Sequence, residues 1–372
     1  MWNLANLLLT IAATCAGPAD AELTPPLATL QAVGPRGAGQ SEAAGAWRKV
    51  AAADARQLPV ILAALDRANP LAANWIATAV DAVAQHQLDR GGPLPTAQLE
   101  AFVRDTRHSG RARRLAYEWL VRADKTAPAR LVPGMIDDPS PEMRRDAVAR
   151  LIGQADAATE AQRSQQATAG YEQALAGATD LDQVRLLTER LQKAGRTVDV
   201  PRHLGLIVRW KLIGPFDNRG EKGFDIAYPP EREFAAAASH EGKHGPVRWV
   251  DHVSSDEYGQ IDLNRVLGTE KGVVGYATVE FLADRRREVE FRLTSFNALK
   301  LWLNGKLIDE HKVYHGGSQM DQYVSRAILA AGRNRILVKI CQNEQTQDWA
   351  VHWWFQLRVC DERGKAVLST DR

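Results

Sequence analysis

The stretch that decides the fold is Leu299-Lys300-Leu301-Trp302-Leu303-Asn304-Gly305-Lys306, in the last quarter of a chain of 372 residues. Its leucines recur at every second position, which places them on one face of an extended strand. Asn304-Gly305 follows directly, and both residue types tolerate the positive φ angles of a tight hairpin turn. The stretch therefore predicts a β-hairpin with one apolar face turned toward a core.

Three other segments carry apolar residues at every second position. The apolar sets are Val289, Phe291 and Leu293; Ile336, Val338 and Ile340; and Val351, Trp353, Phe355, Leu357 and Val359. In each segment one face suits a core and the other suits solvent. Short alternating strands separated by turn signals predict an antiparallel β-sandwich over residues 206–372.

A series of motifs runs through residues 206–362. In chain order they are Trp210-Lys211-Leu212-Ile213-Gly214-Pro215-Phe216, Pro229-Pro230-Glu231, Val247-Arg248-Trp249, Leu301-Trp302-Leu303-Asn304-Gly305-Lys306 and Gly332-Arg333-Asn334-Arg335-Ile336-Leu337-Val338-Lys339. This region resembles the galactose-binding-like jelly-roll domains that accompany glycoside hydrolases and many secreted modular proteins of bacteria. The resemblance implies a jelly-roll sandwich, which is carbohydrate-binding in some members and purely structural in others. It supplies no invariant set of ligand contacts.

The first half of the chain, residues 22–198, predicts an α-helical region, because it is rich in Ala, Leu, Arg and Gln and carries apolar residues at helical spacing. Asn69-Pro70 and Ser140-Pro141 each place a capping side chain before a proline at the first helical position. Residues 199–205 are predicted as a linker to the sandwich. The predicted helices span 40–54, 57–67, 70–86, 96–107, 110–123, 141–153, 157–176 and 180–194.

Two helices of this region look like copies of one unit. Residues 113–121 align with residues 144–152 at an offset of 144 − 113 = 31, and both begin with Arg-Arg. Each copy carries one apolar stripe that must be buried against a neighbour. Residues 137–148 also resemble the HEAT-repeat signature, which implies a stacked helical array with a scaffolding or protein-binding role. An ordinary helical bundle is the alternative.

The N-terminus predicts export. Leu4 to Ala16 is an apolar stretch of 13 residues, which is too short to span a bilayer and is typical of a signal-peptide core. Ala19-Asp20-Ala21 then gives the small-x-small pattern of a cleavage site, so we expect residues 1–21 to be a signal peptide cut after Ala21. Lipidation of Cys15 is the second alternative. We expect the mature protein to be periplasmic or extracellular, with no membrane span.

Charge and cysteine content exclude several classes of function. The 47 Lys and Arg residues nearly balance the 45 Asp and Glu residues, for a net charge of +2, which gives no general attraction to nucleic acid or to anionic membranes. The arginine runs at 111–114 and 285–287 are interpreted as solvated faces. After cleavage only Cys341 and Cys360 remain. They lie at the ends of successive predicted strands, so we expect two isolated thiols.

One motif matches an enzyme pattern. His240-Glu241-Gly242-Lys243-His244 fits H-E-x-x-H, in which two histidines one helical turn apart bind zinc and the glutamate activates a bound water. In a zinc protease His240 and His244 would be the ligands and Glu241 the base. Gly242 inside the motif and Gly245-Pro246 after it disfavour the helix that this chemistry requires. The sequence therefore predicts a solvated loop here.

Two tryptophans suggest a ligand site on the sandwich. Trp302 and Trp354 have the parity of the outward-facing residues of their strands, and an outward tryptophan can stack on a sugar ring. The same parity holds for four residues that can bond to hydroxyl groups: Lys300, Asn304, His352 and Gln356. Carbohydrate binding by these six residues is the hypothesis. The alternative is that the tryptophans pack beneath a loop or against the helical half.

A structural calcium ion is a further hypothesis, with oxygen ligands from Asp217, Asn218, Asp225 and Asp321 but no spacing rule behind them. The sequence as a whole favours a non-catalytic exported protein that binds carbohydrate through the sandwich and protein through the helical array. A hydrolase, either the zinc protease or an enzyme acting on polysaccharides, is the first alternative. A purely structural interaction protein is the second.

Overall fold

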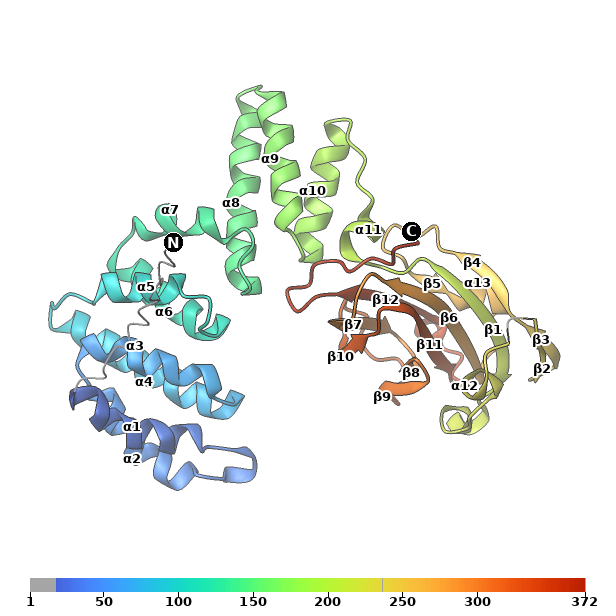
Figure 1. The fold of residues 1–372 in the computed structure, drawn as a ribbon, viewed down its shortest axis with the longest axis horizontal. Helices are drawn as coiled ribbons and strands as arrows, with labels where there is room; N and C mark the ends of the chain where they lie inside the picture. Colours follow the sequence, from blue (N-terminus) through green and yellow to red (C-terminus); the bar gives the residue numbers. More distant parts are fainter. Residues whose placement is uncertain (1–17, 236, 372) are drawn as a thin grey trace, which may run out of the picture. The chain divides into compact units, whose positions relative to one another are not determined.

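The computed structural model describes residues 18–235 and 237–371, and it confirms the predicted order of a helical half followed by antiparallel β-sheets (Figure 1). Its contacts divide the chain into two compact units, one ending at Gly153 and the other beginning at Gln154. The composition change at 199–205 therefore marks where helices give way to strands, while the contacts separate further upstream. The apolar stretch and Cys15 lie outside the described residues, and Ala21 lies in the first turn of a helix.

The first unit is built from helices that pack in successive pairs around one apolar core. Asn69 caps a helix as predicted, because its side-chain oxygen accepts the backbone N–H groups of Leu71 and Ala72. The helices are α1 (Pro18–Gln31), α2 (Gln40–Ala51), α3 (Leu58–Ala63), α4 (Pro70–Asp89), α5 (Thr96–Arg104), α6 (Gly110–Ala123), α7 (Ala127–Leu131) and the first turns of α8 (Pro141–Glu160).

The two aligned segments of the sequence meet at one buried aspartate. Arg113 in α6 donates to both carboxylate oxygens of Asp138, at 2.8 and 2.6 Å. Arg144, at the matching position of α8, donates to the backbone carbonyl of the same residue at 2.8 Å. All three residues are buried. The apolar stripes are buried as well, through Ala116, Trp119, Leu120, Ala147, Val148 and Ile152.

The second unit begins with helices and continues into the sandwich. The prediction of one helix over 157–176 was wrong. Helix α8 continues to Glu160, and the helical conformation is interrupted at Gln162, which adopts a φ of 57°. The predicted linker contains a short helix, which Asp199 caps by accepting the N–H of Arg202. These helices are α9 (Ser164–Gly177), α10 (Leu181–Lys193) and α11 (Val200–Leu204).

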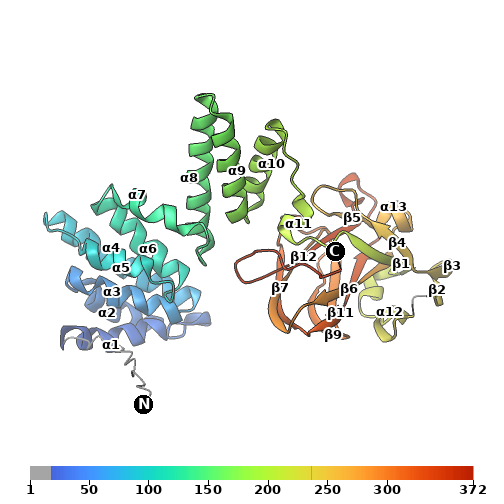
Figure 2. The ribbon, with the colours of Figure 1, turned by 45° about the horizontal axis from the view of Figure 1, so that its top comes forward.

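The sandwich consists of a six-stranded sheet in the order β4-β1-β6-β11-β8-β9 and a four-stranded sheet in the order β10-β7-β12-β5. A separate hairpin, β2–β3, stands off the edge of the sandwich in both views (Figures 1 and 2). The strands are β1 (Arg209–Asp217), β2 (Ser239–Gly242), β3 (Gly245–Arg248), β4 (Val250–Val253), β5 (Ile261–Asp262), β6 (Val273–Ala283), β7 (Arg287–Ser295), β8 (Ala298–Leu303), β9 (Lys306–His311), β10 (Tyr323–Leu329), β11 (Gly332–Gln342) and β12 (Trp354–Cys360).

The predicted alternation places the core correctly. The apolar residues at every second position of β7, β8 and β11 are buried between the two sheets, and so are Trp353, Phe355, Leu357 and Val359. Val351 is the exception, since it precedes the strand and is 45% exposed. The hairpin prediction is confirmed, because β8 and β9 pair through Asn304 and Gly305, whose φ angles are 53° and 80°.

The outer face of the six-stranded sheet is covered rather than open to solvent. Ile213, Tyr276, Trp302, Leu337 and Cys341 point outward from four strands and form a second buried cluster. Phe224, from the turn η5 (Arg219–Phe224), completes this cluster, and the short helix α12 (Pro229–Arg232) follows. Among the described residues, no helix combines the length and apolar character that crossing a bilayer requires.

Gly205 joins the helices to the sandwich and should not tolerate a side chain. Its φ is 76°, and a Cβ there would lie 2.5 Å from the Val359 carbonyl oxygen. We expect Gly205→Ala to destabilise the second unit by about 2–3 kcal/mol. Gly195 is the matched control, since its φ is 74° and no atom lies within 4 Å of its Cβ position. Gly195→Ala should cost about 1 kcal/mol by the φ effect alone. Equal losses in urea titrations of the two variants would contradict the steric argument.

Candidate functional site

The six residues of the predicted carbohydrate site do not form one surface. Lys300, Trp302 and Asn304 extend from β8 on the outer face of the six-stranded sheet, whereas His352, Trp354 and Gln356 belong to β12 or its approach in the other sheet. Both groups point away from the shared core, so they lie on opposite faces of the sandwich. The prediction that all six residues lie on one side of the sandwich is therefore wrong. Alternation along a strand shows which residues share a face of that strand, but not to which sheet the strand belongs.

The three residues of the β8 group are engaged in packing. Trp302 is 8% exposed and lies in the covered cluster, as the packing alternative predicted. The Lys300 ammonium lies 4.4 Å from the centre of the Phe224 ring and pairs with Glu310 at 2.9 Å. Asn304 accepts the backbone N–H of Arg335 at 2.8 Å and thereby fixes the hairpin.

The three residues of the β12 group differ from one another. Gln356 is buried and donates to the backbone carbonyl of Tyr258. His352 and Trp354 lie beside Phe296, with ring centres 5.2 and 6.1 Å from it. These two rings flank the start of β12, at the end of the sandwich where the chain leaves β7 and β11. We call this end, with residues 217–224, 295–298, 311–323 and 342–354, the loop end.

The H-E-x-x-H motif lies in a β-hairpin. His240 and Glu241 belong to β2, and Lys243 and His244 form the turn before β3, so the helix of a zinc protease does not form. His244 Nε2 and Lys243 Nζ both contact Glu270 Oε1, at 2.6 and 2.7 Å. In the described part of the chain no group of three or more His, Cys, Asp or Glu residues is placed to hold a metal ion.

The four proposed calcium ligands are separately engaged. Asp217 pairs with Arg219 at 3.0 Å, and Asp225 pairs with Lys312 at 2.9 Å. Asp321 accepts from Arg292 at 2.9 Å and from Arg358, and these arginines lower the pKa of its carboxyl against the opposing effect of burial. Asn218 is fully buried and donates to the Gln342 carbonyl at 2.9 Å. The two cysteines are free and buried, and burial raises the pKa of Cys341 to about 12 and that of Cys360 to about 11.

Buried carboxamides tie the segments of the loop end together. Asn297, 1% exposed, donates to the Gln342 side-chain oxygen at 2.7 Å. Gln342 in turn donates to the Ala350 carbonyl at 3.0 Å. With the bond from Asn218 to the Gln342 backbone, these contacts join the segments after β1, β7 and β11. The loops are therefore held by side-chain hydrogen bonds in addition to the backbone bonds that Gly272 makes with Asn218 and Asn343.

Four residues beside this network, Trp349, His315, Val313 and Val351, are called the aromatic rim. Trp349, in the turn η6 (Asp348–Ala350), is 52% exposed and meets His315 edge to face, with ring centres 4.9 Å apart. His315 is fixed from the other side by Asn343, whose Oδ1 lies 2.8 Å from Nε2. Val313 and Val351 are also about half exposed. A tryptophan held this way presents a flat apolar surface surrounded by polar groups.

Half of the non-glycine residues with positive φ in the described part of the chain, and three of its buried unpaired side-chain atoms, lie at the loop end. Glu221, His315 and Asp321 adopt φ angles of 59°, 54° and 64°, which non-glycine residues rarely adopt. Three buried side-chain atoms have no hydrogen-bond partner there: Asn218 Oδ1, Asn297 Oδ1 and His315 Nδ1. Both features are typical of binding sites rather than of supporting structure.

Trp349 and His315 were missed by the sequence reasoning, because they lie in loops without periodicity. The available signal was a tryptophan at the end of the polar run Asn343-Glu344-Gln345-Thr346-Gln347-Asp348. Such a polar run marks a loop, so a tryptophan at its end, four residues before the buried Trp353, suggests a surface role.

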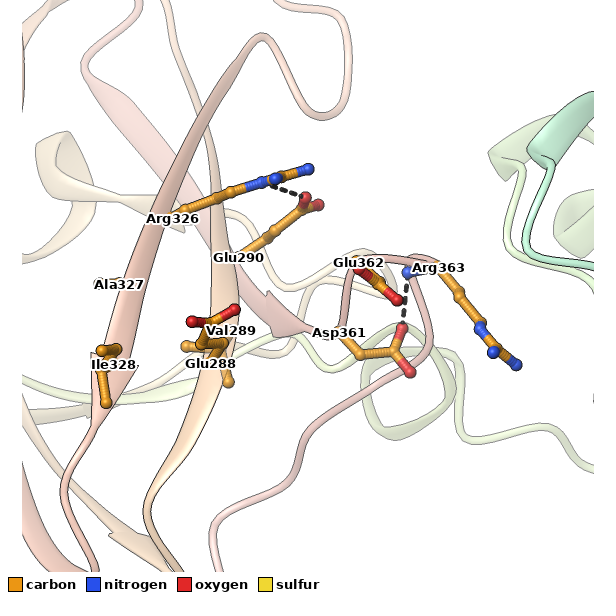
Figure 3. A pocket seen from close by; sticks show the side chains of 9 residues that line it. All are labelled: Glu288, Val289, Glu290, Arg326, Ala327, Ile328, Asp361, Glu362 and Arg363. Carbon is orange, nitrogen blue, oxygen red and sulfur yellow. Dashed lines mark hydrogen bonds and ion pairs between the residues drawn. The ribbon is translucent and has the colours of Figure 1, made fainter. Parts of the chain in front are cut away.

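A concave region lies on the outer face of the four-stranded sheet, away from the loop end, with a volume of about 720 Å³ (Figure 3). In Figure 3 Arg326 reaches toward Glu290, which it contacts at 3.3 Å, and the same carboxylate accepts from Arg292 at 2.7 Å. Asp361 accepts the backbone N–H groups of its own turn, including that of Arg363 at 2.9 Å. The residues that line this concave region include no aromatic ring, and of its six charged residues Arg326 and Glu290 pair with each other.

No family model matches the sequence, and no curated protein matches it. Similar solved structures include an anti-sigma factor domain-containing protein from Clostridium clariflavum, with 14% identity, a TM-score of 0.26 and coverage of 45% of this chain and 46% of that one. A β-glucuronidase from an uncultured Clostridium sp. has 15% identity, a TM-score of 0.25 and coverage of 42% and 28%. A β-glucosidase from Kluyveromyces marxianus in complex with glucose has 13% identity, a TM-score of 0.25 and coverage of 42% and 16%. This chain spans less than half the length of each.

Proposed function

We propose that this chain is a non-catalytic binding protein whose β-sandwich binds carbohydrate at the loop end. The observation that carries the proposal is Trp349, about half exposed and fixed against His315 by a network of buried carboxamides. An indole held in place loses little conformational freedom when a sugar ring stacks on it. Gln345, which is exposed and accepts from Asn343 at 3.2 Å, lies beside the rim and can bond to hydroxyl groups.

The proposal retains two residues of the sequence-based site, His352 and Trp354, and replaces the other four. Lys300, Trp302, Asn304 and Gln356 already have partners in the sandwich, so a ligand would have to displace those contacts. His352 is exposed beside Phe296 at the same end as Trp349. The site thus moves from the faces of the sheets to the loops that connect them.

For the helical half we propose a HEAT-like array that holds a protein partner, and for the whole chain export after cleavage at Ala21. Support for the array comes from the 31-residue offset, at which Arg113 and Arg144 converge on Asp138. Such convergence fits a repeated unit, since the matching arginines of α6 and α8 bond to the same turn. Export rests on the apolar N-terminal stretch alone.

Trp349→Ala should reduce the affinity for a bound polysaccharide about tenfold or more, because it removes the stacking surface. The measurement is retardation of the full chain in native gels cast with a panel of soluble polysaccharides. Ile328→Ala is the control, since Ile328 is 42% exposed and pairs with Glu288 at the opposite end of β10 and β7 from the loop end. Equal retardation of the Trp349→Ala and Ile328→Ala variants, or no retardation of the unaltered chain by any polysaccharide, would show the proposal to be wrong.

A further inference from the structure

The orphaned polar atoms of the loop end are all hydrogen-bond acceptors. Asn343 Oδ1 accepts the backbone N–H of Gln345 at 3.2 Å, which fixes that atom as oxygen. His315 Nε2 must therefore donate to it, so the unpaired Nδ1 carries a lone pair. This tautomer follows from the neighbouring backbone rather than from the position of a hydrogen atom.

The same reasoning applies to the two asparagines. Asn218 Nδ2 faces the Gln342 backbone carbonyl, so its unpaired atom is the oxygen. Gln342 Nε2 faces the Ala350 carbonyl, which leaves Gln342 Oε1 to accept from Asn297 Nδ2. The unpaired atom of Asn297 is again the oxygen. The loop end therefore has acceptors to spare.

Carboxylates add to this excess of negative potential. Glu221 contacts the Asn343 amide at 3.4 Å. Asn343 in turn binds His315, whose ring meets that of Trp349. Glu344 accepts the N–H of Gly220 at 3.0 Å, and Asp348 directly precedes Trp349. The three carboxylates come from the two loops that frame the rim.

Three cations of the neighbouring loops are already engaged, whereas Lys222, next to Glu221 in η5, is exposed. Lys312 pairs with Asp225, which raises the pKa of Lys312, and Arg219 pairs with Asp217. Lys271 donates to the Ala350 carbonyl at 2.6 Å, and burial lowers the pKa of its ammonium. A ligand at Trp349 consequently meets more carboxylates than free ammonium groups, and the unpaired acceptor atoms, which are buried, add negative potential without contacting the ligand.

From this excess of negative potential we infer that the loop end selects a sugar with a protonated amine, a hexosamine unit, over uronic or sulfated sugars. The inference rests on the proposed carbohydrate function and names its ligand class. The sugar ring stacks on Trp349, the ammonium lies near Glu221, Glu344 and Asp348, and the hydroxyl groups supply further donors. A cation beside an indole is also attracted by the ring itself. A uronic carboxylate would meet three like charges against the single exposed ammonium of Lys222.

The test compares three probes on the full chain by microscale thermophoresis: the β-1,4-linked hexamer of glucosamine, its N-acetylated counterpart, and a hexamer of galacturonic acid. Acetylation removes the charge while the backbone of the sugar is kept. We expect the glucosamine hexamer to bind about tenfold more tightly than the acetylated hexamer, and the galacturonate hexamer not to bind. Trp349→Ala should weaken both glucosamine-type probes.

Charge variants locate the effect. Glu221→Gln combined with Asp348→Asn should reduce the preference for the amine over the acetylated probe to about threefold or less, with affinity for the acetylated probe retained. Asp251→Asn, which removes an exposed carboxylate on β4, should leave the preference unchanged. A preference that survives the Glu221 and Asp348 changes would overturn the inference.

Other outcomes separate this inference from the proposed function. Equal binding of the amine and acetylated probes, or preference for galacturonate, with dependence on Trp349 in either case, overturns the charge selection and leaves carbohydrate binding intact. The charge selection is also overturned if a hexalysine peptide binds more tightly than the glucosamine hexamer. The same holds if sugar binding requires added Ca²⁺ and is lost when EDTA is added. Absence of any Trp349-dependent sugar binding contradicts the proposed function itself.

Discussion

Asp138→Ala is expected to lower the unfolding free energy of the helical unit by about 3–5 kcal/mol. The carboxylate accepts two hydrogen bonds from Arg113, and the two side chains are 2% and 6% exposed. It also accepts the backbone N–H of Ser140 at 2.8 Å at the start of α8. The substitution leaves a guanidinium buried without its counter-charge, and water cannot replace the lost partner.

Urea titration followed by far-ultraviolet circular dichroism measures this effect. Glu118→Ala is the matched control, because Glu118 pairs with Arg114 at 2.9 Å while half of its side chain is exposed. An exposed pair of this kind contributes about 0.5 kcal/mol or less. If both variants lost the same stability, burial of the Arg113–Asp138 pair would not explain the loss, and the stabilising role given to Asp138 would be wrong.

Glu231→Ala should have the corresponding effect in the sandwich. Lys339, on β11, has a fully buried side chain, and its ammonium contacts Glu231 at 2.8 Å and the carbonyls of Phe224 and Ile226 at 3.0 and 2.8 Å. The Tyr276 hydroxyl donates to the same carboxylate, which together with burial raises the tyrosine pKa well above its usual range. Loss of the carboxylate leaves a buried cation, at an expected cost of about 3 kcal/mol.

A double variant tests whether the unpaired charge causes this loss. Adding Lys339→Met to Glu231→Ala removes the cation, so much of the lost stability should return, because apolar replacement of a buried pair is often near neutral. Asp251→Ala provides the exposed comparison, since Asp251 pairs with Lys211 while 80% exposed. Guanidinium titrations followed by tryptophan fluorescence give the three values. A double variant less stable than Glu231→Ala would contradict the charge argument.

Periodicity in the sequence was sufficient for the long elements. The alternating leucines of β8 and the Asn304-Gly305 turn predicted the hairpin, because packing and turn geometry there depend on neighbouring residues. Short helices escaped prediction, since α7 and α11 have five residues each, too few for a helical stripe. Helix α1 was also missed, with Pro25 and Pro26 inside it obscuring the pattern.

The candidate site was harder to predict for a physical reason. Trp302 and Trp354 share a parity, but the assignment of β8 and β12 to different sheets depends on pairings between residues far apart in the chain. The cover over Trp302 depends on η5, an irregular segment whose position is set by buried contacts such as that of Lys339 with Phe224. Likewise, the positive φ of His315 is imposed by its surroundings and leaves no trace in composition.

The segment around Gly205 determines how a fragment of this protein should be cut. Ile207 donates its N–H to Leu357, Val359 donates to Gly205, and the Arg358 guanidinium reaches the Leu204 carbonyl. A fragment begun at Arg209, where β1 starts, would strip these partners from β12 and expose a strand edge on which a second molecule can assemble. Aggregation is the expected fate of that fragment, whereas one begun at Gln154 keeps the edge closed.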